Sequence, residues 1–126
     1  MTFTEEEIKK EQLVVDYNDE WRFNDDEKTV DVKFYGFENR LRKFFYLNDD
    51  YGEDWIDCYA TIDPVNEIVT EIFMTFTSNC DLPDRELQMK ITNYPEGRWL
   101  LENMKENDKD VGGFIQFIEE AKKDYV

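Results

Sequence analysis

The sequence predicts an α+β fold in which a short N-terminal helix precedes an antiparallel β-sheet of about five strands, arranged as a meander. Two C-terminal helices are expected to pack on one face of this sheet. Hydrophobic and polar residues alternate in several segments before residue 92, and from Pro95 the hydrophobic residues recur at helical spacing. Strands followed by helices, without regular strand-helix alternation, are typical of the α+β class.

The first helix is predicted from Glu5 to Leu13. Thr4 stands three residues before Glu7, which is the spacing of a capping box, and carboxylates fill the first turn. A brief strand is expected around Glu20 to Phe23. Asn24 to Glu27 then predicts a turn, because Asn and Asp side chains bond readily to their own backbone.

A regular alternation predicts a strand from Thr29 to Phe37. One side carries the hydrophobic residues Val30, Val32 and Phe34, and the other carries Thr29, Asp31, Lys33 and Tyr35. Arg40 to Leu47 is expected to be the hairpin partner of this strand, although its hydrophobic residues also fit one face of a helix.

The clearest hairpin follows a polar segment, Asn48 to Asp54, that is predicted to be a loop. Its strands are Trp55 to Asp63 and Glu67 to Thr77, joined by a turn at Pro64 to Asn66. In the first strand, Ile56, Cys58, Ala60 and Ile62 share the inward face. In the second, the expected inward residues are Ile68, Ile72, Met74 and Phe76, which would turn Glu67, Val69, Glu71 and Phe73 outward.

In the last third of the chain, the spacing of hydrophobic residues changes from the alternation of a strand to the spacing of a helix. A strand is expected where Leu87, Met89 and Ile91 alternate with polar residues, although Pro83 would also suit the start of a helix. Helices follow from Pro95 to Glu106 and behind an N-cap at Asp110. The large hydrophobic residues of these helices are expected to be core residues and not a cofactor site: Met104, Phe114 and Phe117.

The composition limits the partners. The 126 residues include 31 Asp and Glu but 15 Lys and Arg, which gives a formal net charge of −16. Direct binding to nucleic acid or to an anionic membrane surface is therefore not expected. Because 40% of the residues are hydrophobic and 16% aromatic, the chain should fold, as a single domain spanning residues 1–126.

The missing residue types argue against an enzyme. The chain has no histidine and one serine, so it lacks the commonest general base and zinc ligand. Three glycines are isolated and the pair Gly112-Gly113 follows no predicted strand, so no phosphate-binding motif is present. Cys58 and Cys80 lack metal-ligand spacing, so no cofactor or metal is expected. The two cysteines are expected to be ordinary thiols, although a disulfide between them stays open. No signal peptide and no long hydrophobic stretch is found, which favours a cytoplasmic protein.

The acidic residues are concentrated in the middle of the chain. Between Phe44 and Asp84 there are ten carboxylates and no Lys or Arg. The predicted hairpin would place many of them on its outward face beside aromatic residues, and the preceding loop would extend that surface. The candidate partner-binding residues are Asp49, Asp50, Glu53, Asp54, Trp55, Asp57, Tyr59, Asp63, Glu67 and Glu71.

The leading hypothesis is that this face occupies the basic groove of a nuclease or another nucleic-acid-handling protein. Carboxylates on alternate strand residues lie about 6.6 Å apart, similar to the step between successive phosphates. In composition alone, the chain resembles the small acidic inhibitors of the anti-restriction and anti-CRISPR type. That resemblance covers composition only and transfers no residue roles. The chain is expected to be a nucleic-acid mimic and to be a monomer or homodimer.

Three alternatives remain. An immunity protein or antitoxin would have the same size and charge and would cap a basic toxin. The acidic face is also compatible with a structural domain whose charges serve solubility. An EF-hand alignment on Gly52 retains one ligand, Asp49, so the EF-hand motif fails. An irregular calcium site stays open, with the ligands Asp49, Asp50, Glu53, Asp54 and Asp57.

Overall fold

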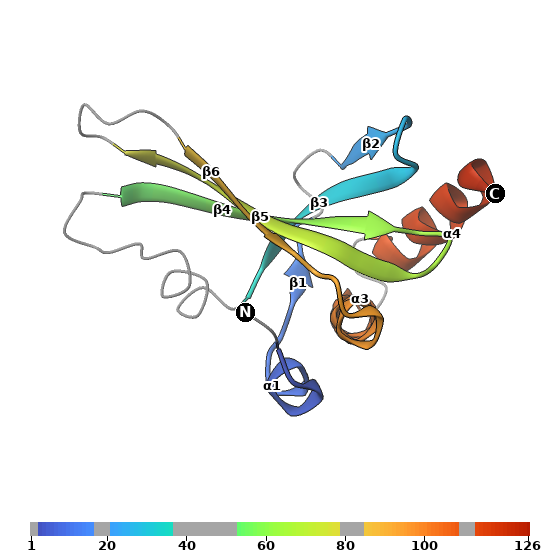
Figure 1. The fold of residues 1–126 in the computed structure, drawn as a ribbon, viewed down its shortest axis with the longest axis horizontal. Coiled ribbons are helices and arrows are strands. Elements are labelled where there is room, and N and C mark those ends of the chain that lie inside the picture. Colours follow the sequence, from blue (N-terminus) through green and yellow to red (C-terminus); the bar gives the residue numbers. More distant parts are fainter. Residues whose placement is uncertain (1–2, 17–20, 37–52, 79–84, 109–112) are drawn as a thin grey trace.

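The computed structural model describes residues 3–16, 21–36, 53–78, 85–108 and 113–126. The elements follow in the order α1 (Glu5–Lys9), β1 (Val14–Val15), β2 (Arg22–Asn24), β3 (Thr29–Tyr35), β4 (Glu53–Asp63), β5 (Ile68–Ser78), β6 (Arg85–Lys90), α3 (Tyr94–Asp108) and α4 (Phe114–Tyr125). The predicted α+β class is confirmed, with the short helix first and two helices last (Figure 1).

The strands form one six-stranded antiparallel sheet in the order β1-β3-β4-β5-β6, with β2 also paired to β3. Strands β3 to β6 make the predicted meander. β3 pairs with β4 on one side and with β1 and β2 on the other. The predicted partner of β3, residues 40–47, lies outside the described residues.

One face of the sheet is covered by helices, and the core lies between them. The predicted alternation is confirmed on β3, where Val30, Val32 and Phe34 are buried, and on β4, where Cys58, Ala60 and Ile62 are buried. From the helices, Met104 and Phe114 are fully buried, and Phe117 packs against the core with its ring 4.5 Å from that of Trp21. These helix residues are therefore core residues, as predicted.

The first helix is shorter than predicted. Its capping box is present, since the Glu7 amide donates to Thr4 Oγ1 over 3.2 Å and the Thr4 amide donates to Glu7 Oε1. The helix ends at Lys9 because the Asn103 side chain on α3 binds the backbone that follows. Asn103 Nδ2 donates to the carbonyls of Ile8 and Glu11 (2.8 and 3.1 Å), and its Oδ1 accepts from the Leu13 amide (3.0 Å).

The start of α4 also differs from the prediction. Asp110 lies outside the described residues, and the N-cap is Gly113, whose φ of 72° is the left-handed conformation that glycine adopts most easily. Gly113 has no side chain to accept a hydrogen bond from the first turn. Asp108 takes this role from the end of α3, because its Oδ2 accepts from the Phe114 amide over 3.2 Å.

A β-bulge changes which residues of β5 face the core. Thr61 pairs with Glu71, but the next residue, Ile62, pairs with Val69, so Thr70 is an extra residue on β5. The bulge places both Val69 and Ile72 in the core, each fully buried. The prediction that Val69 faces outward was wrong, because strict alternation does not hold across an inserted residue.

One element boundary is also corrected. β4 begins at Glu53, so Glu53 and Asp54 belong to a strand and not to the predicted loop. Residues 85–90 form a strand, as the alternation of hydrophobic and polar residues predicts, and not a helix that begins at Pro83. Helix α3 then lies directly on β5, since a Cβ at Gly97 would be 2.5 Å from the Val69 carbonyl oxygen.

Candidate functional site

The described helices leave one face of the sheet uncovered, which we call the open face. One row of side chains crosses this face over five strands, because the strand register places them opposite one another: Arg22, Asp31, Thr61, Glu71 and Lys90. A second row runs beside it through Lys33, Tyr59, Phe73 and Gln88. Charged and aromatic residues therefore dominate the open face.

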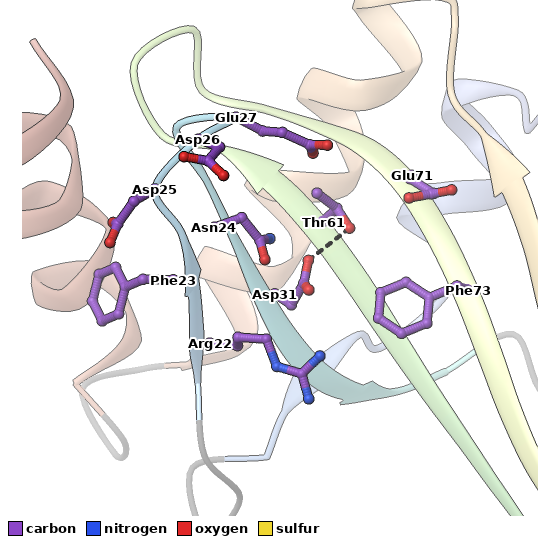
Figure 2. Close-up of a pocket in the computed structure, with 10 residues that line it drawn as sticks. All are labelled: Arg22, Phe23, Asn24, Asp25, Asp26, Glu27, Asp31, Thr61, Glu71 and Phe73. Atoms are coloured by element: carbon purple, nitrogen blue, oxygen red, sulfur yellow. Dashed lines mark hydrogen bonds between the residues drawn. The ribbon is translucent and has the colours of Figure 1, made fainter.

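At the β2–β3 end of the open face, the turn and the neighbouring strands enclose a hollow of about 600 Å³. We call it the acidic hollow, because five of its ten lining residues are carboxylates (Figure 2). The full lining is Arg22, Phe23, Asn24, Asp25, Asp26, Glu27, Asp31, Thr61, Glu71 and Phe73. Residues of β2 and of the β2–β3 turn form one wall of the acidic hollow, and residues of β5 form the opposite wall.

Two hydrogen bonds fix the shape of the acidic hollow. Thr61 Oγ1 donates to Asp31 Oδ1 over 2.7 Å across the β3–β4 pair, and Thr61 is only 7% exposed although it lies on the open face. The Tyr125 hydroxyl of α4 donates to Asp25 Oδ1 over 3.0 Å and so ties the turn to the C-terminal helix. Burial, with this bond to Asp25, raises the pKa of Tyr125 to about 12.

Further along the open face, Lys33 is surrounded by acidic and aromatic groups. Its Nζ lies 3.2 Å from Asp57 Oδ1 and 4.0 Å from Asp16 Oδ2. The Tyr35 hydroxyl donates to Asp16 Oδ2 over 2.8 Å, and this bond and burial raise the pKa of Tyr35. We call these four residues the lysine cluster. Its carboxylates are at least partly neutralised by Lys33.

An aromatic pair lies between the lysine cluster and the acidic hollow. Tyr59 on β4 and Phe73 on β5 are opposite each other, with ring centroids 5.0 Å apart and planes 10° from parallel. Both residues are partly exposed. Rigid aromatic side chains of this kind contribute contact area at low entropic cost, so the pair suits a contact surface.

Three of the ten candidate residues from the sequence lie together on the open face, with their side chains described: Asp57, Tyr59 and Glu71. Asp57 belongs to the lysine cluster, Tyr59 to the aromatic pair and Glu71 to the acidic hollow. The long acidic stretch is thus partly relieved by a cation from a neighbouring strand, because Lys33 Nζ lies 3.2 Å from Asp57 Oδ1. Lys90 lies opposite Glu71 in the strand register.

Two candidates have structural roles instead. Asp63 Oδ1 accepts from the amides of Val65 and Asn66, and its Oδ2 accepts from Asn66 Nδ2, so this carboxylate holds the β4–β5 turn. Glu67 lies in the same turn at a φ of 57° and not on the outward row of a strand.

Glu67 turns towards the helices. Its Oε1 lies 3.2 Å from Lys105 Nζ on α3, and its Oε2 lies 3.9 Å from Lys122 Nζ on α4. The prediction that Glu67 belongs to an outward acidic row with Glu71 was therefore wrong. The turn and the bulge at Thr70 separate the two residues.

The other five candidates are less fully described. Asp49 and Asp50 lie outside the described residues. Glu53, Asp54 and Trp55 form the start of β4, where Glu53 pairs with Ser78 and Trp55 pairs with Thr77. Most of the ligands of the irregular calcium alternative belong to these five residues, and within the described ranges no group of three or more His, Cys, Asp or Glu is arranged to hold a metal ion.

The acidic hollow itself was missed at the sequence level. The sequence predicts a turn at Asn24 to Glu27, and it correctly predicts that Asp31 lies on the outward side of its strand. The missing step was the strand order, which sets Asp31 opposite Thr61 and thereby brings the turn beside Glu71. The sequence does carry a signal for the β2–β3 hairpin. A short strand precedes the acidic turn, and an alternating strand follows it.

Comparison with known protein families, with curated proteins and with solved structures finds no match to this chain. The geometry described above is therefore the basis for assigning a function. Among the described helices, none combines the length and apolar character needed to cross a membrane.

Proposed function

We propose that this protein is a non-enzymatic inhibitor that occupies the basic groove of a nucleic-acid-handling protein. It would act as a nucleic-acid mimic of the anti-CRISPR or anti-restriction type. The main supporting observation is the acidic hollow on the open face, bordered by a partly exposed aromatic pair. The net charge of −16 would steer the chain towards a basic surface before contact.

The proposed contact surface is narrower than the acidic stretch of the sequence. It comprises the carboxylates of the acidic hollow, together with Tyr59 and Phe73. Asp63 and Glu67 are excluded because both carboxylates stabilise the hairpin or bind helix lysines. Asp57 is placed at the margin of this surface, since Lys33 offsets its charge.

A variant of three residues tests this proposal. Asp26→Asn, Glu27→Gln and Glu71→Gln remove three of the five carboxylates of the acidic hollow. As a matched control, Glu6→Gln, Glu106→Gln and Glu119→Gln remove three exposed charges from the helices. Each immobilised form is incubated with host-cell extract. The retained proteins are then eluted with duplex DNA or RNA at constant ionic strength and identified by mass spectrometry.

We expect the wild-type chain and the helix control to retain a nucleic-acid-binding protein that nucleic acid displaces. The hollow variant should retain at least tenfold less of it. Retention that nucleic acid does not displace would exclude a groove mimic, and equal retention by the hollow variant would exclude this surface.

A second candidate is an immunity protein for a basic toxin. The observation that favours it is the compact shape of the acidic hollow, which suits a few basic side chains better than a long groove. In that case a neighbouring gene should encode the toxin, and co-expression with this chain should relieve its lethality. A toxin that is not a nucleic-acid-binding protein would distinguish this candidate from the first.

A further inference from the structure

The acidic hollow combines negative charge with a flat aromatic surface. Figure 2 shows the ring of Phe73 face-on at the β5 side of the hollow. Tyr59 stacks against the same ring and so restricts its orientation. A planar cation that enters the hollow would therefore meet both carboxylates and an aromatic ring in a fixed position.

Asp31 is the best-positioned carboxylate for such a cation. Thr61 donates to one of its oxygens, Oδ1, and thereby orients the carboxylate across the β3–β4 pair. Within the described ranges, no hydrogen bond is made to the other oxygen, Oδ2. Arg22 lies opposite Asp31 in the register, but no ion pair within 4.0 Å joins it to a described carboxylate.

These two features favour arginine over lysine. A guanidinium is planar, donates two parallel hydrogen bonds to one carboxylate and stacks on aromatic rings, whereas an ammonium is a compact and strongly hydrated charge. A hollow of about 600 Å³ is wide enough to admit such a side chain together with part of the backbone that presents it.

We propose that the acidic hollow is a receptor for an arginine side chain of the partner, stacked on Phe73 and paired with Asp31. This proposal depends on the proposed function for the nature of the partner. Arginine binding itself is measurable without that partner. The acidic turn at Asp25 to Glu27 adds long-range attraction and Glu71 borders the site from β5.

The test is a titration followed by amide NMR at constant ionic strength. The probes are blocked arginine, blocked lysine and blocked citrulline, which has nearly the shape of arginine without its charge. We expect arginine to cause saturable shifts at the amides of Asp31, Thr61 and Phe73. Lysine should bind about two- to fivefold more weakly, the range that one exposed cation-aromatic contact supplies, and citrulline should not bind.

Two variants localise the effect. Phe73→Leu should reduce arginine affinity to that of lysine, and Glu71→Gln should weaken both probes while keeping the preference for arginine. Glu119→Gln on α4 should change neither affinity. Equal affinity for arginine and lysine, or shifts spread over exposed carboxylates on the helices, would overturn the proposal.

The result also separates this proposal from the proposed function. If the chain binds arginine but retains no partner that nucleic acid displaces, the arginine receptor is supported and the proposed groove mimic is rejected. Retention of such a partner without arginine binding would reject the receptor alone.

Discussion

The two faces of the sheet use their polar side chains differently. On the helix-covered face, buried polar groups bind the backbone: Glu96 accepts from the Phe3 amide over 2.8 Å, and Asn103 binds the segment after α1. On the open face, Asp31 and Lys33 bind other side chains. Burial requires a fixed partner for each polar group, whereas the open face leaves charge accessible to another molecule.

This difference predicts that substitutions on the covered face cost more stability than substitutions on the open face. The largest effect is expected for Asn103→Ala. The substitution leaves the Leu13 amide and the carbonyls of Ile8 and Glu11 without the side chain that binds them. We expect a loss of about 2–4 kcal/mol in the free energy of unfolding, measured by urea denaturation.

Asn107→Ala is the matched control for that experiment. Asn107 Nδ2 donates to the backbone and side-chain oxygens of Asn103, but it is only partly buried and binds no other described segment. Its removal should cost less than about 1 kcal/mol. If Asn103→Ala lowers the free energy of unfolding no more than Asn107→Ala does, the hydrogen bonds from Asn103 to the backbone of Ile8, Glu11 and Leu13 do not stabilise the fold.

An intermediate effect is expected for Lys33→Met, at the centre of the lysine cluster. Methionine keeps much of the hydrophobic stem but removes the ammonium group that lies beside Asp16 and Asp57. Because the Lys33 side chain is only 19% exposed, we expect a loss of about 1–2 kcal/mol in urea denaturation at neutral pH.

The lysine cluster also allows a coupling test. In the Lys33→Met background, Asp57→Asn should recover part of the lost stability, because it removes a carboxylate that no longer has a cation. Lys90→Met, at the edge of the sheet and exposed, should cost little. Equal costs for the two lysine substitutions would mean that the cluster behaves as ordinary surface.

The smallest effect is expected for Tyr125→Phe, which tests the link between the covered face and the acidic hollow. At neutral pH the lost bond to Asp25 should cost about 0.5–1.5 kcal/mol. The pKa of this phenol is raised from 10.0 to about 12, so its contribution is complete below pH 10 and is lost as the pH rises towards 12.

The variant should therefore lose less stability than the wild type between pH 10 and pH 12, as followed by thermal unfolding. Tyr35→Phe is the comparison, since the bond to Asp16 also raises the pKa of Tyr35 but on the open face. A wild type and Tyr125→Phe variant with parallel pH curves would contradict the role assigned to this hydroxyl.

The sequence predicted most of the fold because its signals were local. The capping box at Thr4 and the alternation in β3 and β4 each depend on residues close in the chain, and these predictions are confirmed. The bulge at Thr70 left no comparable signal, since Glu67 to Phe73 fits strict alternation equally well. The assignment of Val69 and Glu67 to the outward row failed for this reason.

The candidate site was only partly predictable because charge depends on neighbouring strands. A count along the chain finds no cation near Asp57, but β3 lies beside β4 and brings Lys33 within 3.2 Å. The same strand order joins Asp31 and the turn at Asp25 to Glu71. Register and strand order are long-range properties that composition and spacing do not contain.

Thr70 has a consequence for how the sequence tolerates change. The side chains of β5 alternate on either side of this residue, but the alternation shifts by one position across it. Val69 before it therefore faces the core, and Glu71 and Phe73 after it lie on the open face. Deletion of Thr70 would make the alternation continuous, so that either a core residue such as Val69 or the open-face residues Glu71 and Phe73 would turn to the wrong face of the sheet. Insertions and deletions at this position should therefore be rarer among functional descendants than substitutions of any hollow residue.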